Sequence, residues 1–152
     1  MLARLVLIGA AVAQLAASGD ESTLLRIREH MLERAIAGKN KPLLLALTGK
    51  GFNADFQANF DDYFLYRESL KREEWIHRLL HLHLDSYEIV VLKIQIPKPD
   101  QAAVVVDEYW GIHSPRGTRI QKRFHTSDAW HKSDGVWKLD LRLSVESEPG
   151  TK

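Results

Sequence analysis

The 152-residue chain contains no cysteine. This absence excludes disulfide bonds, thiolate metal sites, a cysteine nucleophile and a lipid-modified cysteine. The 21 basic and 20 acidic side chains leave a formal net charge of +1, and Lys and Arg are scattered rather than gathered into a stripe. Because nucleic-acid binding depends on such a basic field, we expect no nucleic-acid partner.

Long apolar runs are also missing, except at the N-terminus. Arg4 precedes an apolar and small-residue run from Leu5 to Ala17, and Ala16-Ala17-Ser18 offers small residues at a cleavage site. The run is shorter than the ~20 residues that a membrane span needs. The pattern predicts a signal peptide over 1–18, so we expect a secreted or periplasmic protein with no stable membrane span once the leader is removed. The alternative is an amphipathic or buried N-terminal helix.

Helical patterns follow the leader. Apolar residues recur at spacings of three and four, with charged residues between them, which predicts a helix over 22–37. Pro42 is well placed in the first turn of a shorter helix that ends near Thr48. A third helix is expected to begin at Ser69, with acidic residues in its first turn.

Strand patterns dominate after Asp85. The phenylalanines of 52–60 favour an earlier strand, although their spacing of four also suits a helix face. Turn residues separate the later strands, and the Asp134-Gly135 pair is a strong hairpin signal. The predicted later strands cover 87–96, 102–113, 119–131 and 136–147. We therefore expect one α+β domain over 22–147, with helices against one face of a curved sheet and a flexible tail over 148–152.

The last strand has the clearest alternation. Every second residue from Trp137 to Val145 is apolar, and Lys138, Asp140 and Arg142 lie between them. A period of two predicts one buried and one polar face. We therefore expect the leucines of this strand to be buried and Arg142 to face water.

Four segments, in their order and spacing, resemble a known superfamily. They are LRIREHMLERAIAGKN, KREEWIHRL, the strand opening at Asp100, and the hairpin SDAWHKSDGVWKL. Together these segments resemble the nuclear transport factor 2-like superfamily, which includes ketosteroid isomerase and SnoaL-like cyclases. The resemblance covers about 22–146 and is nearest to the bacterial domain of unknown function 4440.

The resemblance implies a cone-like, cystatin-like α+β fold. N-terminal helices would pack on a curved, mostly antiparallel sheet, leaving a deep pocket between them. It also implies a homodimer formed through the sheet, and no cofactor. Because members of the superfamily differ in chemistry, the resemblance does not carry a catalytic role to any residue here.

The pocket candidates are acids, phenols and cations that could face such a pocket. An apolar pocket can raise the pKa of an aspartate, a tyrosine can donate to a developing enolate, and an Arg–His pair can hold an anion. The alternative is that Asp107 is solvated and Tyr109 is sheet packing. The candidates are Asp62, Tyr66, Asp107, Tyr109, Arg123 and His125.

Strand register decides whether these candidates meet. A turn centred between Pro115 and Arg116 places residue 109 opposite about 122, and residue 107 opposite about 124. In that register His125 lies nearer to Val106 than to Tyr109, which argues against one cluster.

The seven histidines invite a metal-site interpretation. His77 and His81 are four apart on a predicted helix, but Arg78 stands where a zinc-protease helix has glutamate. No converging set of further ligands is evident. We therefore expect no metal site and interpret this helix face as exposed.

Three functions remain open. The first is an exported protein that binds a small molecule in a pocket between helices and sheet. The second is a cofactor-independent isomerase, dehydratase or cyclase, favoured by a buried carboxylate within hydrogen-bond reach of a pocket phenol. The third is a dimeric interaction module without a ligand.

The leader supplies the first testable prediction. Mass spectrometry of the protein from its native cell should find a mature N-terminus close to Gly19, because the small residues at 16–18 suit signal peptidase. A mature chain that still carries Leu2 or Arg4 would contradict the prediction.

Overall fold

The structure, a computed structural model, describes residues 2–61 and 64–147, and the side chains of 19–58 and 67–147. Nine elements follow one another within these ranges. They are α1 (Leu2–Ala37), α2 (Lys41–Leu47), β1 (Thr48–Asp61), β2 (Phe64–Lys71), α3 (Arg72–His81), β3 (Leu84–Lys98), β4 (Gln101–His113), β5 (Arg119–Ser133) and β6 (Val136–Ser147).

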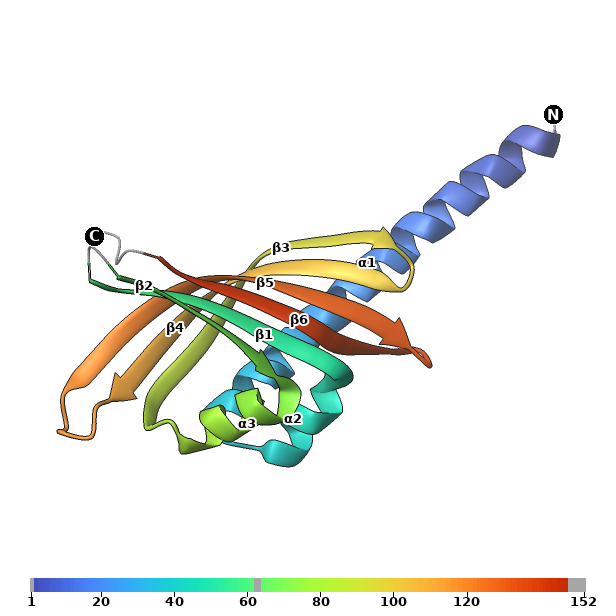
Figure 1. The fold of residues 1–152 in the computed structure, drawn as a ribbon. Helices are drawn as coiled ribbons and strands as arrows, with labels where there is room; N and C mark the ends of the chain where they lie inside the picture. Colours follow the sequence, from blue (N-terminus) through green and yellow to red (C-terminus); the bar gives the residue numbers. More distant parts are fainter. Residues whose placement is uncertain (1, 62–63, 148–152) are drawn as a thin grey trace.

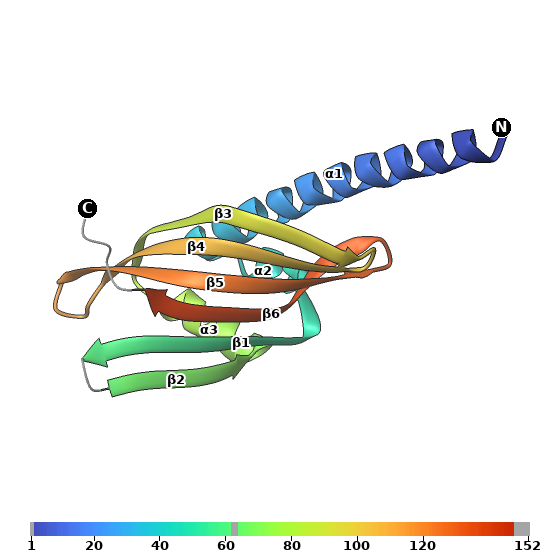
Figure 2. The ribbon, with the colours of Figure 1, turned by 90° about the horizontal axis from the view of Figure 1, so that it is seen from above.

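The six strands form one curved sheet in the order β2-β1-β6-β5-β4-β3 (Figure 1). Strands β1 and β6 pair in parallel, and the other neighbours pair antiparallel. The helices lie against one face of the sheet, while the first half of α1 extends beyond it (Figures 1 and 2). The predicted α+β class, with helices on a mostly antiparallel sheet, is confirmed. Among the described residues no helix is long and apolar enough to span a membrane.

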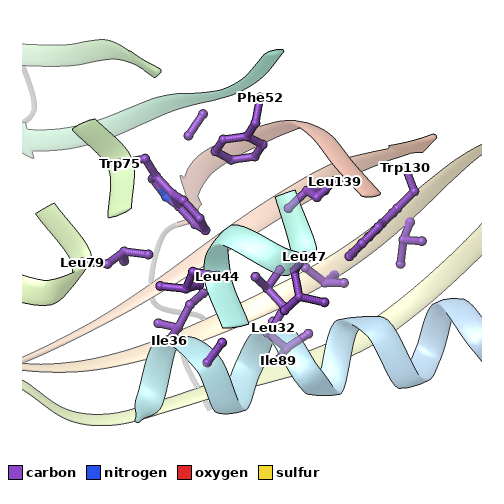
Figure 3. Packing of buried hydrophobic residues seen from close by; sticks show 14 of the residues in the cluster. Leu32, Ile36, Leu44, Leu47, Phe52, Trp75, Leu79, Ile89, Trp130 and Leu139 are labelled. Carbon is purple, nitrogen blue, oxygen red and sulfur yellow. The ribbon is translucent and has the colours of Figure 1, made fainter. Parts of the chain in front are cut away.

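The core lies between the concave face of the sheet and the three helices (Figure 3). Leu32 and Ile36 of α1 meet Leu44 of α2, while Trp75 of α3 packs on Phe52 of β1 with ring centroids 4.8 Å apart. Fully burying an aliphatic side chain contributes about 1.5–3 kcal/mol. This packing holds the helices at one end of the sheet.

Helix boundaries follow local chemistry. Asn40 caps α2 by accepting a hydrogen bond from the Leu43 backbone N–H, and a proline follows in the first turn. The prediction that α3 begins at Ser69 is wrong, because Ser69–Lys71 pair with β1 and the helix begins at Arg72. The Glu74 carboxylate accepts from the Lys71 backbone N–H and fixes that start.

The last strand changes face part-way along its length. The register between β5 and β6 shifts at Asp140, where Ala129 pairs with Leu141 but Trp130 pairs with Leu139. An inserted residue of this kind turns the following side chains to the opposite faces. The expectation for the second half of β6 is therefore wrong: Arg142 is 2% exposed and Leu143 is 41% exposed.

This bulge can be tested with two matched leucines. Leu139→Ala should lower the free energy of unfolding by about 2–5 kcal/mol, since Leu139 is fully buried. Leu143→Ala should change the free energy of unfolding of the single chain by less than ~0.5 kcal/mol, because Leu143 is 41% exposed there. Urea denaturation at protein concentrations at which the chain is monomeric measures both values. Equal losses would show that β6 keeps one register throughout.

Candidate binding site

A cavity of about 240 Å³ lies between the concave face of the sheet and α3. Its walls are mostly apolar and come from five elements, so the curvature of the sheet creates the space. The apolar and aromatic residues that line it are Ala54, Phe56, Ala58, Leu70, Trp75, Leu79, Leu82, Trp110, Ile112 and Phe124.

Polar side chains reach the cavity in two places. Glu108, Arg142 and Ser144 form its buried floor. The other charged lining residues are engaged elsewhere: Arg78 pairs with Glu68 and Lys122 pairs with Glu146. Asp55 accepts a hydrogen bond from Ser69 at 2.6 Å. The Arg78–Glu68 pair is bidentate, with one N–O distance of 2.7 Å, and the Lys122–Glu146 distance is 2.9 Å.

The Glu108 carboxylate is 1% exposed and contacts four groups. Oε1 accepts from the Tyr87 hydroxyl and lies 2.9 Å from Nη1 of Arg142. Oε2 accepts from the hydroxyls of Thr126 at 2.6 Å and Ser144 at 3.3 Å. Each oxygen therefore meets two partners, as a buried carboxylate requires.

The Arg142 guanidinium joins Glu108 to a second carboxylate. Its Nε and Nη2 donate to the two oxygens of Asp128 at 2.8 and 2.7 Å, a bidentate pair. Burial acts to lower the pKa of Arg142, but the charges of Asp128 and Glu108 outweigh it and raise that pKa well above its usual value. Arg142 is thus a permanent cation in the core.

A third carboxyl group, Glu29 of α1, lies beside this network. Its Oε1 accepts from the indole N–H of Trp130 at 2.8 Å. Burial, followed by the charge of Asp128, raises the pKa of Glu29 well above its usual value. Burial also raises the pKa of Asp128, although the Arg142 charge opposes that rise. We therefore treat Glu29 as protonated and Asp128 as the ionised partner of Arg142.

Sequence reasoning missed the residues of this network. A signal existed for Glu29, which stands four residues after Leu25 and three before Leu32 on the apolar stripe of α1. Glu108 likewise continues the buried alternation of Val104 and Val106 in β4. No comparable signal existed for Arg142, because its face depends on the bulge at Asp140.

Four of the predicted pocket residues do come together, but away from the cavity. The turn between β4 and β5 is centred on Arg116 rather than between Pro115 and Arg116, so Asp107 faces His125 and Tyr109 faces Arg123. None of the four lines the cavity, because Glu108 and Trp110 take the inward positions of β4. They lie on the outer face of the sheet.

Asp107 is the centre of this outer cluster. It is 5% exposed, and it accepts from Arg123 at 2.5 Å and pairs with the His125 Nδ1 at 2.9 Å. Burial alone would raise the pKa of Asp107, but the bonds from His125 and Arg123 outweigh it and lower that pKa. The Arg123 guanidinium lies 5.6 Å from the ring centroid of Tyr109, within cation–π range.

The side chains of the other two pocket candidates lie outside the described part of the chain. Asp62 is outside the described residues, and Tyr66 belongs to β2 without a described side chain.

His77 and His81 stack on α3 with ring centroids 4.2 Å apart. Within residues 2–61 and 64–147, no group of three or more His, Asp or Glu side chains is arranged to hold a metal ion.

Solved structures share this architecture. A nuclear transport factor 2-like protein from Cytophaga hutchinsonii is similar at 17% identity and a TM-score of 0.67, covering 83% of this chain and 98% of that one. A ketosteroid isomerase-like protein from Erwinia carotovora atroseptica is similar at 11% identity and a TM-score of 0.65, with 84% and 96% covered. A hexachlorocyclohexane dehydrochlorinase is similar at 9% identity and a TM-score of 0.66, with 88% and 89% covered.

These similarities show that the chain has the nuclear transport factor 2-like α+β fold, as its sequence motifs predicted. No family model and no curated protein matches the sequence. The resemblance to the domain of unknown function 4440 therefore stays a prediction.

The Glu29 carboxyl group gives a pH-dependent prediction. Its raised pKa means that the unfolded chain ionises above about pH 4.5, whereas the folded chain holds the proton. The stability that Glu29 contributes to the wild type is therefore fully present below about pH 4.5. It is lost as the pH rises from there towards the raised pKa of Glu29 in the folded protein. Glu29→Gln removes that loss, so the stability of the variant relative to wild type should increase from pH 4 to pH 8.

Urea unfolding at both pH values measures this difference. Glu73→Gln in the first turn of α3 is the control, because its side chain is 67% exposed. A relative stability of Glu29→Gln that is constant or falls with pH would show that Glu29 is ionised in the folded protein.

Proposed function

We propose that this protein binds a small, mostly apolar molecule in the cavity between α3 and the sheet. The observation that carries the proposal is a cavity with apolar walls and a few polar groups converging at one end, Glu108 and Ser144 among them. This is the usual composition of a small-molecule site, in which apolar walls supply affinity and few polar groups fix orientation.

The size of the cavity limits the ligand. Its volume of about 240 Å³ is below the ~300–1,000 Å³ of pockets for drug-sized ligands. A compound with one ring, or a short branched chain, fits this space better than a fused multi-ring compound.

A second candidate is a cofactor-independent isomerase, dehydratase or cyclase. The buried Glu108 carboxylate contacts the Tyr87 phenol, which is the pairing that such a mechanism needs. Similar structures include a ketosteroid isomerase-like protein and a dehydrochlorinase. However, both Glu108 oxygens are already occupied, so proton transfer requires a substrate to displace a partner. Binding requires no such change, and we therefore prefer it. Turnover that Glu108→Gln abolishes would reverse this preference.

The proposal includes export and pairing of two copies through the sheet. The apolar run from Leu5 to Ala17 suggests export.

The outer face of the sheet exposes four apolar or aromatic side chains that are 38–45% exposed: Val90, Tyr109, Leu143 and Val145. Burying such side chains between two copies is favourable. Sedimentation velocity should show a dimer that Leu143→Arg dissociates, and a monomeric wild type would overturn this part of the proposal.

Filling the cavity tests the binding proposal. Ala54 lines the cavity, and Ala54→Phe should place a ring inside it and weaken binding of p-cresol by at least ~10-fold. The probe joins one apolar ring to one hydroxyl. NMR signals of the indole N–H groups follow binding, because Trp75 and Trp110 line the cavity whereas Trp130 and Trp137 do not.

The control is Ala103→Phe, the same substitution at an exposed position of β4. Its affinity for p-cresol should equal that of wild type. The proposal fails if folded wild type gives no saturable shift of the Trp75 and Trp110 signals, or if Ala54→Phe binds p-cresol as well as wild type does.

A further inference from the structure

The charges beneath the cavity do not balance. The carboxyl groups of Glu29, Glu108 and Asp128 surround one buried cation, Arg142. With Glu29 protonated, two carboxylates still face a single guanidinium. The buried network that includes the floor therefore has two carboxylates, Glu108 and Asp128, for one guanidinium, in an interior where charges interact far more strongly than in water.

The other cations that line the cavity do not correct this excess. Lys122 lies 2.9 Å from Glu146, and Arg78 forms a bidentate pair with Glu68. Both cations are thus engaged with carboxylates of their own. The buried network around Arg142 favours an occupant that brings positive charge.

The walls above the floor are aromatic. Phe56 and Phe124 have ring centroids 4.9 Å apart, and Phe124 and Trp110 meet edge to face at 6.3 Å. Tyr87 continues the series, with its ring 4.6 Å from that of Trp110. Trp75 lines the cavity from α3. The rings of Phe56, Trp110, Phe124 and Trp75, from three strands and one helix, therefore line the same space, with Tyr87 behind them.

From these features together we infer that the cavity takes a small organic cation, an alkylated or quaternary ammonium compound. The inference rests on the proposed binding function and names its ligand class. Alkylated ammonium groups are attracted to aromatic faces and gain more from that attraction when water is excluded. The carboxylate of Glu108 supplies the opposing charge without a direct hydrogen bond, which a quaternary ammonium group cannot donate.

An anion suits this site less well. The Arg142 guanidinium donates to Asp128 and pairs with Glu108, so an incoming anion would compete with both carboxylates. An anion would also lie beside the Glu108 charge within an apolar enclosure, which is unfavourable. A cation meets neither obstacle.

Two probes of the same shape separate charge from size. Phenyltrimethylammonium and tert-butylbenzene differ in one central atom, which is a charged nitrogen in the first and a carbon in the second. We expect wild type to bind the cation at least ~10-fold more tightly, with shifts of the Trp75 and Trp110 indole signals and none of Trp130 or Trp137. NMR titration gives both affinities.

Variants test the source of that preference. Glu108→Gln removes the floor charge while keeping the shape, and Phe124→Leu removes a ring from the wall. Both should reduce the preference for the cation to about threefold or less. Asp107→Asn is the matched control, because this neighbouring carboxylate points to the outer face and does not line the cavity. It should leave the preference unchanged.

The possible outcomes distinguish a failure of this inference from a failure of the proposed binding function. If wild type binds tert-butylbenzene as tightly as the cation, the inference is overturned and the cavity remains a site for neutral ligands. If neither probe nor p-cresol binds, the inference and the binding function both fail. Should Glu108→Gln not fold, the comparison of the two probes on wild type decides the matter alone.

Discussion

A single enclosed guanidinium constrains four of the six strands of the sheet. Arg142 of β6 is held between Asp128 of β5 and Glu108 of β4, and its Nη1 also donates to the Tyr87 hydroxyl of β3 at 3.2 Å. Removing charges from water costs several kcal/mol for each ion, and only complete pairing offsets that cost. Four neighbouring strands must therefore keep the register that brings these groups together.

The two faces of the sheet have different chemistry because of this arrangement. Asp107 and Glu108 are adjacent in β4, yet one pairs with Arg123 and His125 outside, while the other reaches the cavity floor inside. The Glu108 and Arg142 side chains of the inner face are engaged with neighbouring polar groups, so the space above them is bounded mostly by aromatic and aliphatic walls. A mostly apolar cavity over a charged floor follows, and the binding proposal rests on that combination.

Much of the fold could be predicted from local patterns. Periodicity indicated residues 22–37 of α1 and the strands from β3 onward, and the Asp134-Gly135 turn has the positive φ angles of 51° and 76° that such a pair favours. The candidate site could be predicted only in part, because the placement of Arg142 and the pairing of β4 with β5 depend on details of register. The turn after His113 is centred on Arg116 rather than between Pro115 and Arg116, and Asp140 is inserted as a bulge.

The turn decides which residues of β4 and β5 pair, the bulge exchanges the faces of the residues that follow it in β6, and no local pattern reveals either. The Leu–Arg–Leu sequence at 141–143 alternates equally well in either register, so burial of Arg142 is decided by its partners on other strands. Those partners lie more than a dozen residues away in sequence. Tertiary pairing, rather than propensity, therefore determined the site.

The free energy of unfolding of Arg142→Met tests the central role of this guanidinium most directly. Removing one member of a buried, hydrogen-bonded ion pair leaves its partners uncompensated, so we expect a loss of about 3–5 kcal/mol relative to wild type. Arg116→Met in the exposed turn provides the baseline and should change stability by less than ~0.5 kcal/mol. If both variants unfold at the same urea concentration as wild type, with the same dependence on urea, Arg142 does not hold the sheet together and the account is wrong.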